Sequence, residues 1–112
     1  MVAISKSEFG IDIEKVKPIK PTTLKKALSD IELNEIYKVQ NDDLRSQKLL
    51  KIWTIKESIL KAVGTGLTIH PSKISINNNQ GTLNNTSYRY FNIPHVPGFV
   101  GSIAMKEGKT VI

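Results

Sequence analysis

The longest regular feature of this 112-residue sequence is a helical pattern that runs from Asn41 to about Val63. Asn41, Asp42 and Asp43 are typical of a helix start, and the glycines Gly64 and Gly66 are typical of a helix end. Apolar side chains recur at the spacings of one helix face, namely Leu49, Leu50, Trp53, Leu60 and Val63. The sequence therefore predicts one long amphipathic helix in the middle of the chain.

Shorter elements are predicted before this helix. Phe9–Ile13, with Val2–Ile4 ahead of it, has the alternating, β-branched character of a strand. Thr22 and Thr23 can cap a short helix over Leu24–Leu28. Ser29-Asp30-Ile31-Glu32 has the form of a capping box, in which Ser29 and Glu32 bond each other's backbone N–H groups. It predicts a further helix that reaches about Val39.

Three strands are predicted after the long helix: Ile74–Ile76, Ser87–Ile93 and Phe99–Met105. The asparagine-rich stretch Asn77–Gly81 is predicted as a loop or turn. The order of one strand, then helices, then several strands predicts an α+β fold with a mainly antiparallel sheet. A chain of this length is expected to form a single domain over residues 1–112.

The net charge indicates the kind of partner that the chain would bind but does not identify the partner. The formal net charge is +6, which favours an acidic partner or a polyphosphate ligand, although a basic soluble surface alone would give the same charge. Surfaces that bind nucleic acids typically have basic residues interleaved with aromatic ones. This sequence has no such pattern, so nucleic-acid binding is not expected. No signal peptide or membrane-length apolar run is visible, and there is no cysteine for disulfides or thiolate metal sites. A cytoplasmic location is expected.

The first group of chemical interest is the carboxylate pair Asp12 and Glu14 in Phe9-Gly10-Ile11-Asp12-Ile13-Glu14. Alternation along a strand places Ile11 and Ile13 on one face and both carboxylates on the other. The two Cα atoms would then lie about 7 Å apart, close enough for both side chains to bind one cation. Oxygen-only carboxylate ligands suit Mg²⁺. The alternative interpretation is an edge strand with a solvent-exposed acidic face.

The second group lies on the long helix in Trp53-Thr54-Ile55-Lys56-Glu57-Ser58-Ile59-Leu60-Lys61. Trp53, Glu57 and Lys61 are spaced four apart and so share one helix face. Glu57 can be a third carboxylate for the metal, and Lys61 a phosphate ligand. The alternative is an aromatic core residue followed by an ordinary Glu–Lys surface pair.

Gly-Ile-Asp-Ile-Glu followed, 41 positions after Asp12, by the motif that begins at Trp53 resembles the two-part signature of the Sfp-type 4′-phosphopantetheinyl transferases. Gly64-Thr65-Gly66-Leu67 also resembles the family, including its single-domain holo-acyl-carrier-protein synthases. Gly98-Phe99-Val100 is similar to the start of the closing strand of Sfp-type proteins. The resemblance covers Val2 to Met105.

The resemblance implies a function and a role for each site residue. Such enzymes transfer the phosphopantetheine arm of coenzyme A to a serine of an acidic acyl or peptidyl carrier protein. Asp12, Glu14 and Glu57 match the positions that hold Mg²⁺. Lys61 matches the lysine that contacts the phosphate under attack, and Lys56 matches a basic residue near the cofactor. Glu32 matches a glutamate that is proposed to activate the serine. Glu32 also has its capping-box role as an alternative.

The chain also differs from the family pattern. Sfp-type proteins have two similar halves, and the chain resembles only the second, starting just before the aspartate motif. The histidine that the family keeps in the first half has no match here, because His70 and His95 have the sequence context of ordinary loop residues. A single half presents one wall of the cofactor cleft, so a homo-oligomer is expected, a trimer rather than a dimer. The alternative function is a catalytically incompetent half-domain that binds carrier protein or coenzyme A.

Overall fold

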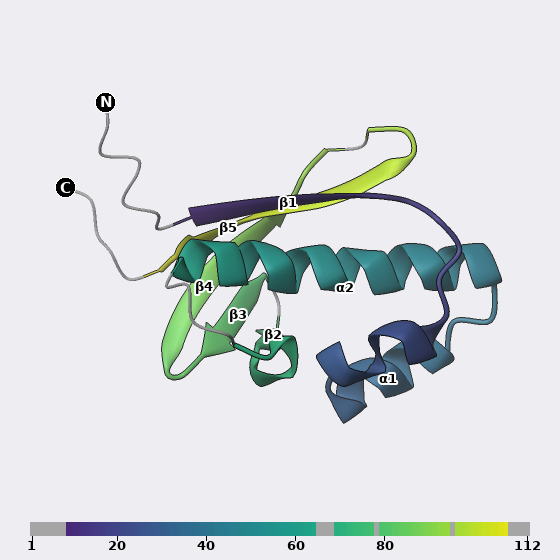
Figure 1. The fold of residues 1–112 in the computed structure, drawn as a ribbon, viewed down its shortest axis with the longest axis horizontal. Helices are drawn as coiled ribbons and strands as arrows, with labels where there is room; N and C mark the ends of the chain where they lie inside the picture. Colours follow the sequence, from purple (N-terminus) through teal and green to yellow (C-terminus); the bar gives the residue numbers. More distant parts are fainter. Residues whose placement is uncertain (1–8, 65–68, 78, 95, 108–112) are drawn as a thin grey trace.

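The computed structural model describes residues 9–64, 69–77, 79–94 and 96–107. Within these ranges the chain forms the strand β1 (Phe9–Lys15), a 3₁₀ helix (Pro21–Ala27), and the helices α1 (Asp30–Tyr37) and α2 (Asp42–Val63). A short 3₁₀ helix (Pro71–Lys73) then leads to the strands β2 (Ser75–Asn77), β3 (Gln80–Leu83), β4 (Thr86–Asn92) and β5 (Phe99–Lys106). The predicted order of strand, helices and strands is confirmed, as is the α+β class (Figure 1).

The five strands form one antiparallel sheet in the order β1-β5-β4-β3-β2. The first strand therefore lies beside the last, with Gly10 opposite Ala104 and Asp12 opposite Ser102. Helix α2 lies along β1 and β5, and α1 with the first 3₁₀ helix packs near the start of α2 (Figure 1). The first and last strands thus pair in the part of the sheet that α2 covers.

Helix α2 has the ends that the sequence predicts. The side chain of Asn41 accepts a hydrogen bond from the backbone N–H of Leu44 and caps the start of the helix. Gly64 ends it in the left-handed conformation with φ of 59°, which glycine adopts without steric cost. None of the helices in the described part of the chain has both the length and the apolar character of a membrane span.

Three details of the local predictions are settled by the structure. The capping box is present, since Ser29 and Glu32 each accept a hydrogen bond from the other's backbone N–H. The predicted threonine cap is wrong, because the first 3₁₀ helix begins at Pro21 and has no side-chain cap. The loop predicted at Asn77–Gly81 is wrong at both ends, since Asn77 belongs to β2 and Gln80 and Gly81 open β3. Val2–Ile4 and Gly66 lie outside the described residues.

The faces of β1 are the reverse of what its apolar residues alone would suggest. Asp12 is buried at 5% exposure, whereas Ile11 and Ile13 remain 48% and 56% exposed. Gly10 explains the close approach, because a Cβ atom there would lie 2.3 Å from the carbonyl oxygen of Ser58. Only glycine allows the β1 backbone to lie directly on α2. The face of β1 that carries the carboxylates therefore meets the helix.

Part of the opposite face of the sheet is apolar and exposed. We call it the outer sheet face and define it by five side chains between 39% and 56% exposed: Phe9, Ile11, Ile13, Phe91 and Met105. The strand register places Ile11 and Phe91 on either side of Ile103, and Phe9 opposite Met105. These residues come from β1, β4 and β5 and form one continuous patch, which is unusual for a face in permanent contact with water.

Candidate functional site

The residues of the two sequence motifs meet where β1 lies along α2. Asp12 and Glu14 lie on the helix-facing side of β1, and Trp53, Glu57 and Lys61 lie along α2. We call Asp12, Glu14 and Glu57 the carboxylate cluster. A solvent-exposed acidic strand face, the alternative interpretation of the first motif, is excluded for Asp12 by its burial.

Asp12 is the most informative member of the cluster. Its Oδ1 atom accepts a hydrogen bond of 2.8 Å from the Nζ atom of Lys61, which also donates to the carbonyl oxygen of Ile11 at 3.2 Å. Its Oδ2 atom is buried and has no hydrogen-bond partner within the described residues. A buried carboxylate oxygen without a partner is costly, so proteins retain one chiefly where a further donor or a cation binds.

The environment of Glu14 and Glu57 disfavours the charged form of both side chains. Burial raises the pKa of Glu57, and the nearby charge of Asp12 raises it further, while Lys61 opposes both effects. Burial likewise raises the pKa of Glu14, and Asp12 adds to this effect. A hydrogen bond from Trp53 partly stabilises the charged form of Glu14. The cluster therefore carries more negative charge than its surroundings neutralise.

Lys61 is the counter-charge of this cluster. Its side chain is 51% exposed, although its ammonium touches buried Asp12. The hydrogen bond to Asp12 raises the pKa of Lys61, and the charges of Glu57 and Glu14 act in the same direction. As the side chains stand, no group of three or more acidic or histidine residues in the described ranges is gathered closely enough to hold a metal ion. Lys61 occupies one oxygen of Asp12 instead.

The chemistry of the donor set nevertheless suits a hard divalent cation. The cluster offers only carboxylate oxygens, it has a buried oxygen without a partner, and its glutamates are destabilised when charged. A cation such as Mg²⁺ would relieve all three conditions, since it prefers oxygen ligands and keeps water in its remaining positions. A phosphate group brought to such a site would find both a cation and the exposed ammonium of Lys61.

A comparison with protein families decides the identity. The model of the 4′-phosphopantetheinyl transferase superfamily matches residues 8–97, a range that contains every residue of the site described above. The chain belongs to this superfamily.

Relatives within the superfamily support the same conclusion. The chain is 31% identical over 74 residues to the 4′-phosphopantetheinyl transferase Sfp of Bacillus subtilis (strain 168), a match that covers 66% of this chain and 33% of that protein. It is 38% identical over 80 residues to the 4′-phosphopantetheinyl transferase gsp of Aneurinibacillus migulanus, covering 70% of this chain and 32% of that protein. The chain thus spans about a third of the length of these curated relatives.

A solved structure has the same fold. The crystal structure of the holo-[acyl-carrier-protein] synthase of Thermotoga maritima superposes with a TM-score of 0.66 at 16% sequence identity. The match covers 90% of this chain and 63% of that one. At this identity the likeness concerns the fold, and it agrees with the predicted α+β class with an antiparallel sheet.

Two further residues predicted to act in this superfamily site form a separate pair. Lys56 is fully buried, and its Nζ atom donates to the Oε1 atom of Glu32 at 2.7 Å and to the carbonyl oxygen of Ala27 at 2.9 Å. Burial lowers the pKa of Lys56, and Glu32 opposes that shift. The pair ties α1 and the first 3₁₀ helix to α2. The roles of Lys56 at the cofactor and of Glu32 as a base stay predictions, and both require this pair to open.

The remaining predictions concern the histidines and the second motif. His70 has the structural role of an ordinary loop residue, because its Nδ1 atom accepts a hydrogen bond of 3.3 Å from the backbone N–H of Ser72 and caps the short 3₁₀ helix. His95 lies outside the described residues. The role of Trp53 as the hydrogen-bond partner of Glu14 was missed, although its spacing from Glu57 and Lys61 placed it on the right face of α2.

Proposed function

We propose that this chain transfers the 4′-phosphopantetheine arm of coenzyme A to a serine of an acyl or peptidyl carrier protein, with Mg²⁺ as the metal. The observation that carries the proposal is the buried Oδ2 atom of Asp12, which has no partner in the described ranges and lies beside two carboxylates. Membership of the superfamily and the names of the matched relatives support the reaction type.

The metal would be held by Asp12, Glu14 and Glu57. When bound, Mg²⁺ supplies neutralisation of the pyrophosphate charge of coenzyme A. Lys61 neutralises Asp12 in the structure, and its ammonium would be available to a phosphate group if a cation neutralised the carboxylates instead. Its 51% exposed side chain has the freedom to move to that group.

The chemical step needs a base for the serine proton. The serine oxygen forms a bond to the phosphorus that carries pantetheine, the P–O bond to the adenosine phosphate breaks, and the serine proton passes to a carboxylate. Glu57 is one candidate, because burial and Asp12 raise its pKa and so strengthen it as a base. Glu32 is the other, but it must first release Lys56. Acidic carrier proteins suit the net charge of +6.

A second candidate function is favoured by the length of the match. Because the chain spans about a third of its curated relatives, a half-domain that binds carrier protein or coenzyme A without transfer is the alternative. The two functions differ in one measurable product, a carrier protein whose mass has risen by one phosphopantetheine.

We also propose that the working form is a homo-oligomer, a trimer rather than a dimer, in which the outer sheet face is covered. The exposed apolar side chains of that face support this proposal. Introducing a charge with Phe91→Asp should then reduce the oligomer to a monomer, because a carboxylate would be buried without a partner. Light scattering behind a sizing column at micromolar concentration measures the mass.

The control for this variant is Tyr37→Asp, which places the same charge on an exposed aromatic residue of α1. It should keep the oligomeric mass of the unmodified chain. A chain that is already monomeric, or a Phe91→Asp variant with unchanged mass, would refute the assignment of the outer sheet face as the interface.

A further inference from the structure

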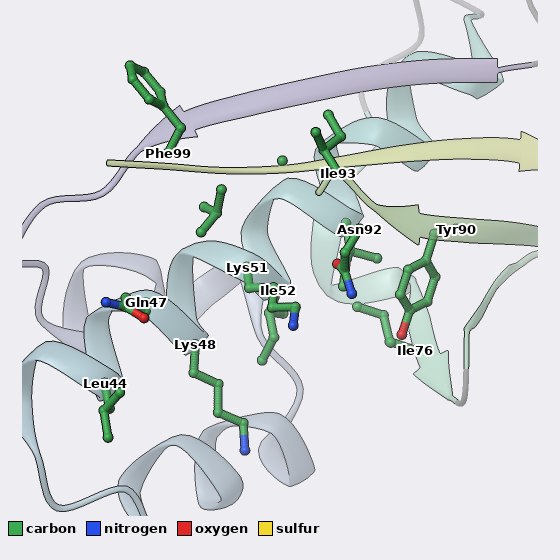
Figure 2. A pocket seen from close by; sticks show the side chains of 13 residues that line it. Leu44, Gln47, Lys48, Lys51, Ile52, Ile76, Tyr90, Asn92, Ile93 and Phe99 are labelled. Atoms are coloured by element: carbon green, nitrogen blue, oxygen red, sulfur yellow. The ribbon is translucent and has the colours of Figure 1, made fainter. Parts of the chain in front are cut away.

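A pocket of about 610 Å³ lies on a different side of α2 from the carboxylate cluster. Figure 2 shows side chains that line it, among them Leu44, Lys48 and Ile52 of α2, Tyr90 of β4, and Ile93 just after β4. Lys48 and Glu57 are nine residues apart, which at about 100° per residue puts them on opposite sides of the helix. The pocket is therefore separate from the site proposed for phosphopantetheine transfer.

The walls of this pocket are mainly apolar. Ile52 and Ile55 contribute from α2, and Ile76, Ile93 and Val100 contribute from the sheet and the segment after β4. None of the residues that line it is an aspartate or a glutamate. A volume of this size is typical of sites that enclose a small organic molecule.

The charged residues that line the pocket are both lysines, which attract an anion. Lys48 and Lys51 lie one helical turn apart at its edge, and neither forms an ion pair with any carboxylate in the described ranges. The hydroxyl of Tyr90 and the amide of Asn92 also line the pocket, and neither side chain makes a hydrogen bond to another described residue. Two cations and two uncommitted polar groups therefore border an apolar cavity.

We propose that this pocket binds a small organic anion with an apolar body, such as a medium-chain carboxylate. The carboxylate lies between Lys48 and Lys51, and the chain extends over Ile52 and Ile76 towards Tyr90. Opposite charge selects the head group, since a cation would meet two ammonium groups and no carboxylate. The cavity volume matches a small molecule better than a protein surface, which needs a much larger contact area. This proposal does not depend on the transferase function.

The probe is decanoate, titrated below its micelle concentration into the full chain while methyl and amide NMR signals are followed. The signals of Ile52, Ile76 and Tyr90 should shift and saturate together, whereas those of Glu57 and Lys61 should stay in place. Decanol, which has the same chain without the charge, should bind at least tenfold more weakly, and decyltrimethylammonium should not bind.

The variant that tests the head-group site is Lys48→Met with Lys51→Met. Both side chains belong to exposed residues, so the core of α2 is unaffected, and decanoate affinity should fall at least tenfold. The matched control is Lys25→Met with Lys26→Met on the first 3₁₀ helix, which should bind decanoate as the unmodified chain does. The proposal would be overturned if decanol bound as tightly as decanoate, or if the Lys48→Met, Lys51→Met variant kept its decanoate affinity. It would also be overturned if the NMR shifts were confined to the carboxylate cluster, or if no saturable shift appeared at millimolar decanoate.

Discussion

The variant Glu57→Gln should raise the melting temperature of the metal-free protein by a few degrees at neutral pH and abolish its further rise in Mg²⁺. Burial and the charge of Asp12 raise the pKa of Glu57, so its charged form opposes folding, and the neutral glutamine removes that cost. The unmodified chain should gain stability as Mg²⁺ is added, because a ligand that binds only the folded state stabilises it. Thermal unfolding with and without Mg²⁺ measures both effects.

The pH dependence provides a second test of the same variant. A carboxyl whose pKa is raised by folding stabilises the folded state below its unfolded pKa, and this stabilisation is lost as pH rises through the folded pKa. Glu14 and Glu57 both have raised pKa values, so the metal-free chain should become more stable as pH is lowered from 7 towards their ordinary value of 4.5. This gain should be smaller in Glu57→Gln, which keeps only the contribution of Glu14.

The matched control is Glu35→Gln, which changes an exposed glutamate of α1 paired with Lys38 at 3.3 Å. Exposed pairs of this kind contribute little to stability, so the control should keep both the melting temperature and the response to Mg²⁺. A Glu57→Gln variant that still responds to Mg²⁺ like the unmodified chain would remove Glu57 from the proposed metal site.

The variant Gly10→Ala should destabilise the protein by about 3 kcal/mol, at the upper end of the usual cost of overpacking. A Cβ atom at this position would lie 2.3 Å from the Ser58 carbonyl oxygen and 2.6 Å from the Ala62 nitrogen, both backbone atoms that cannot move aside. Because β1 carries Asp12 and α2 carries Glu57, the response to Mg²⁺ should weaken as the two elements separate. Urea unfolding with and without Mg²⁺ measures both quantities.

Gly81→Ala is the control for this prediction, since Gly81 is also a strand glycine in the core. Its added Cβ atom would meet the Cδ1 atom of Ile59, the end of a side chain that can rotate away. Its cost should be smaller, about 1 kcal/mol, with the response to Mg²⁺ intact. Equal costs for the two variants would contradict the assignment of Gly10 as the contact that sets the site.

Local signals predicted much of the fold. Asn41 and Gly64 predicted both ends of α2, and Ser29 with Glu32 predicted the start of α1, because caps depend on a few neighbouring residues. Strand β3 was missed, although the turn after it carried a signal. Asn84 and Asn85 both have positive φ, of 51° and 65°, as two-residue hairpin turns require.

The site could be predicted only in part for a physical reason. Alternation places Asp12 opposite Ile11 and Ile13, but it does not tell which face packs on the helix, and here the polar face does. The fit of Gly10 against the backbone of α2 decides the matter, and that is a tertiary contact. Likewise, nothing near Lys56 in the sequence indicates that its ammonium is buried on Ala27 and Glu32. The anion pocket assembles from four elements, so no local pattern could reveal it.

The most direct test of the proposed function is the mass of an apo-carrier protein after incubation with this chain, coenzyme A and Mg²⁺. We expect a mass gain of one phosphopantetheine on the carrier, with a rate at least a hundredfold lower for Glu57→Gln and no gain when a chelator removes the metal. Apo-forms of fatty-acid, polyketide and peptide carriers should each be offered. A folded, oligomeric chain that leaves every carrier mass unchanged would contradict transfer and favour the binding-only half-domain.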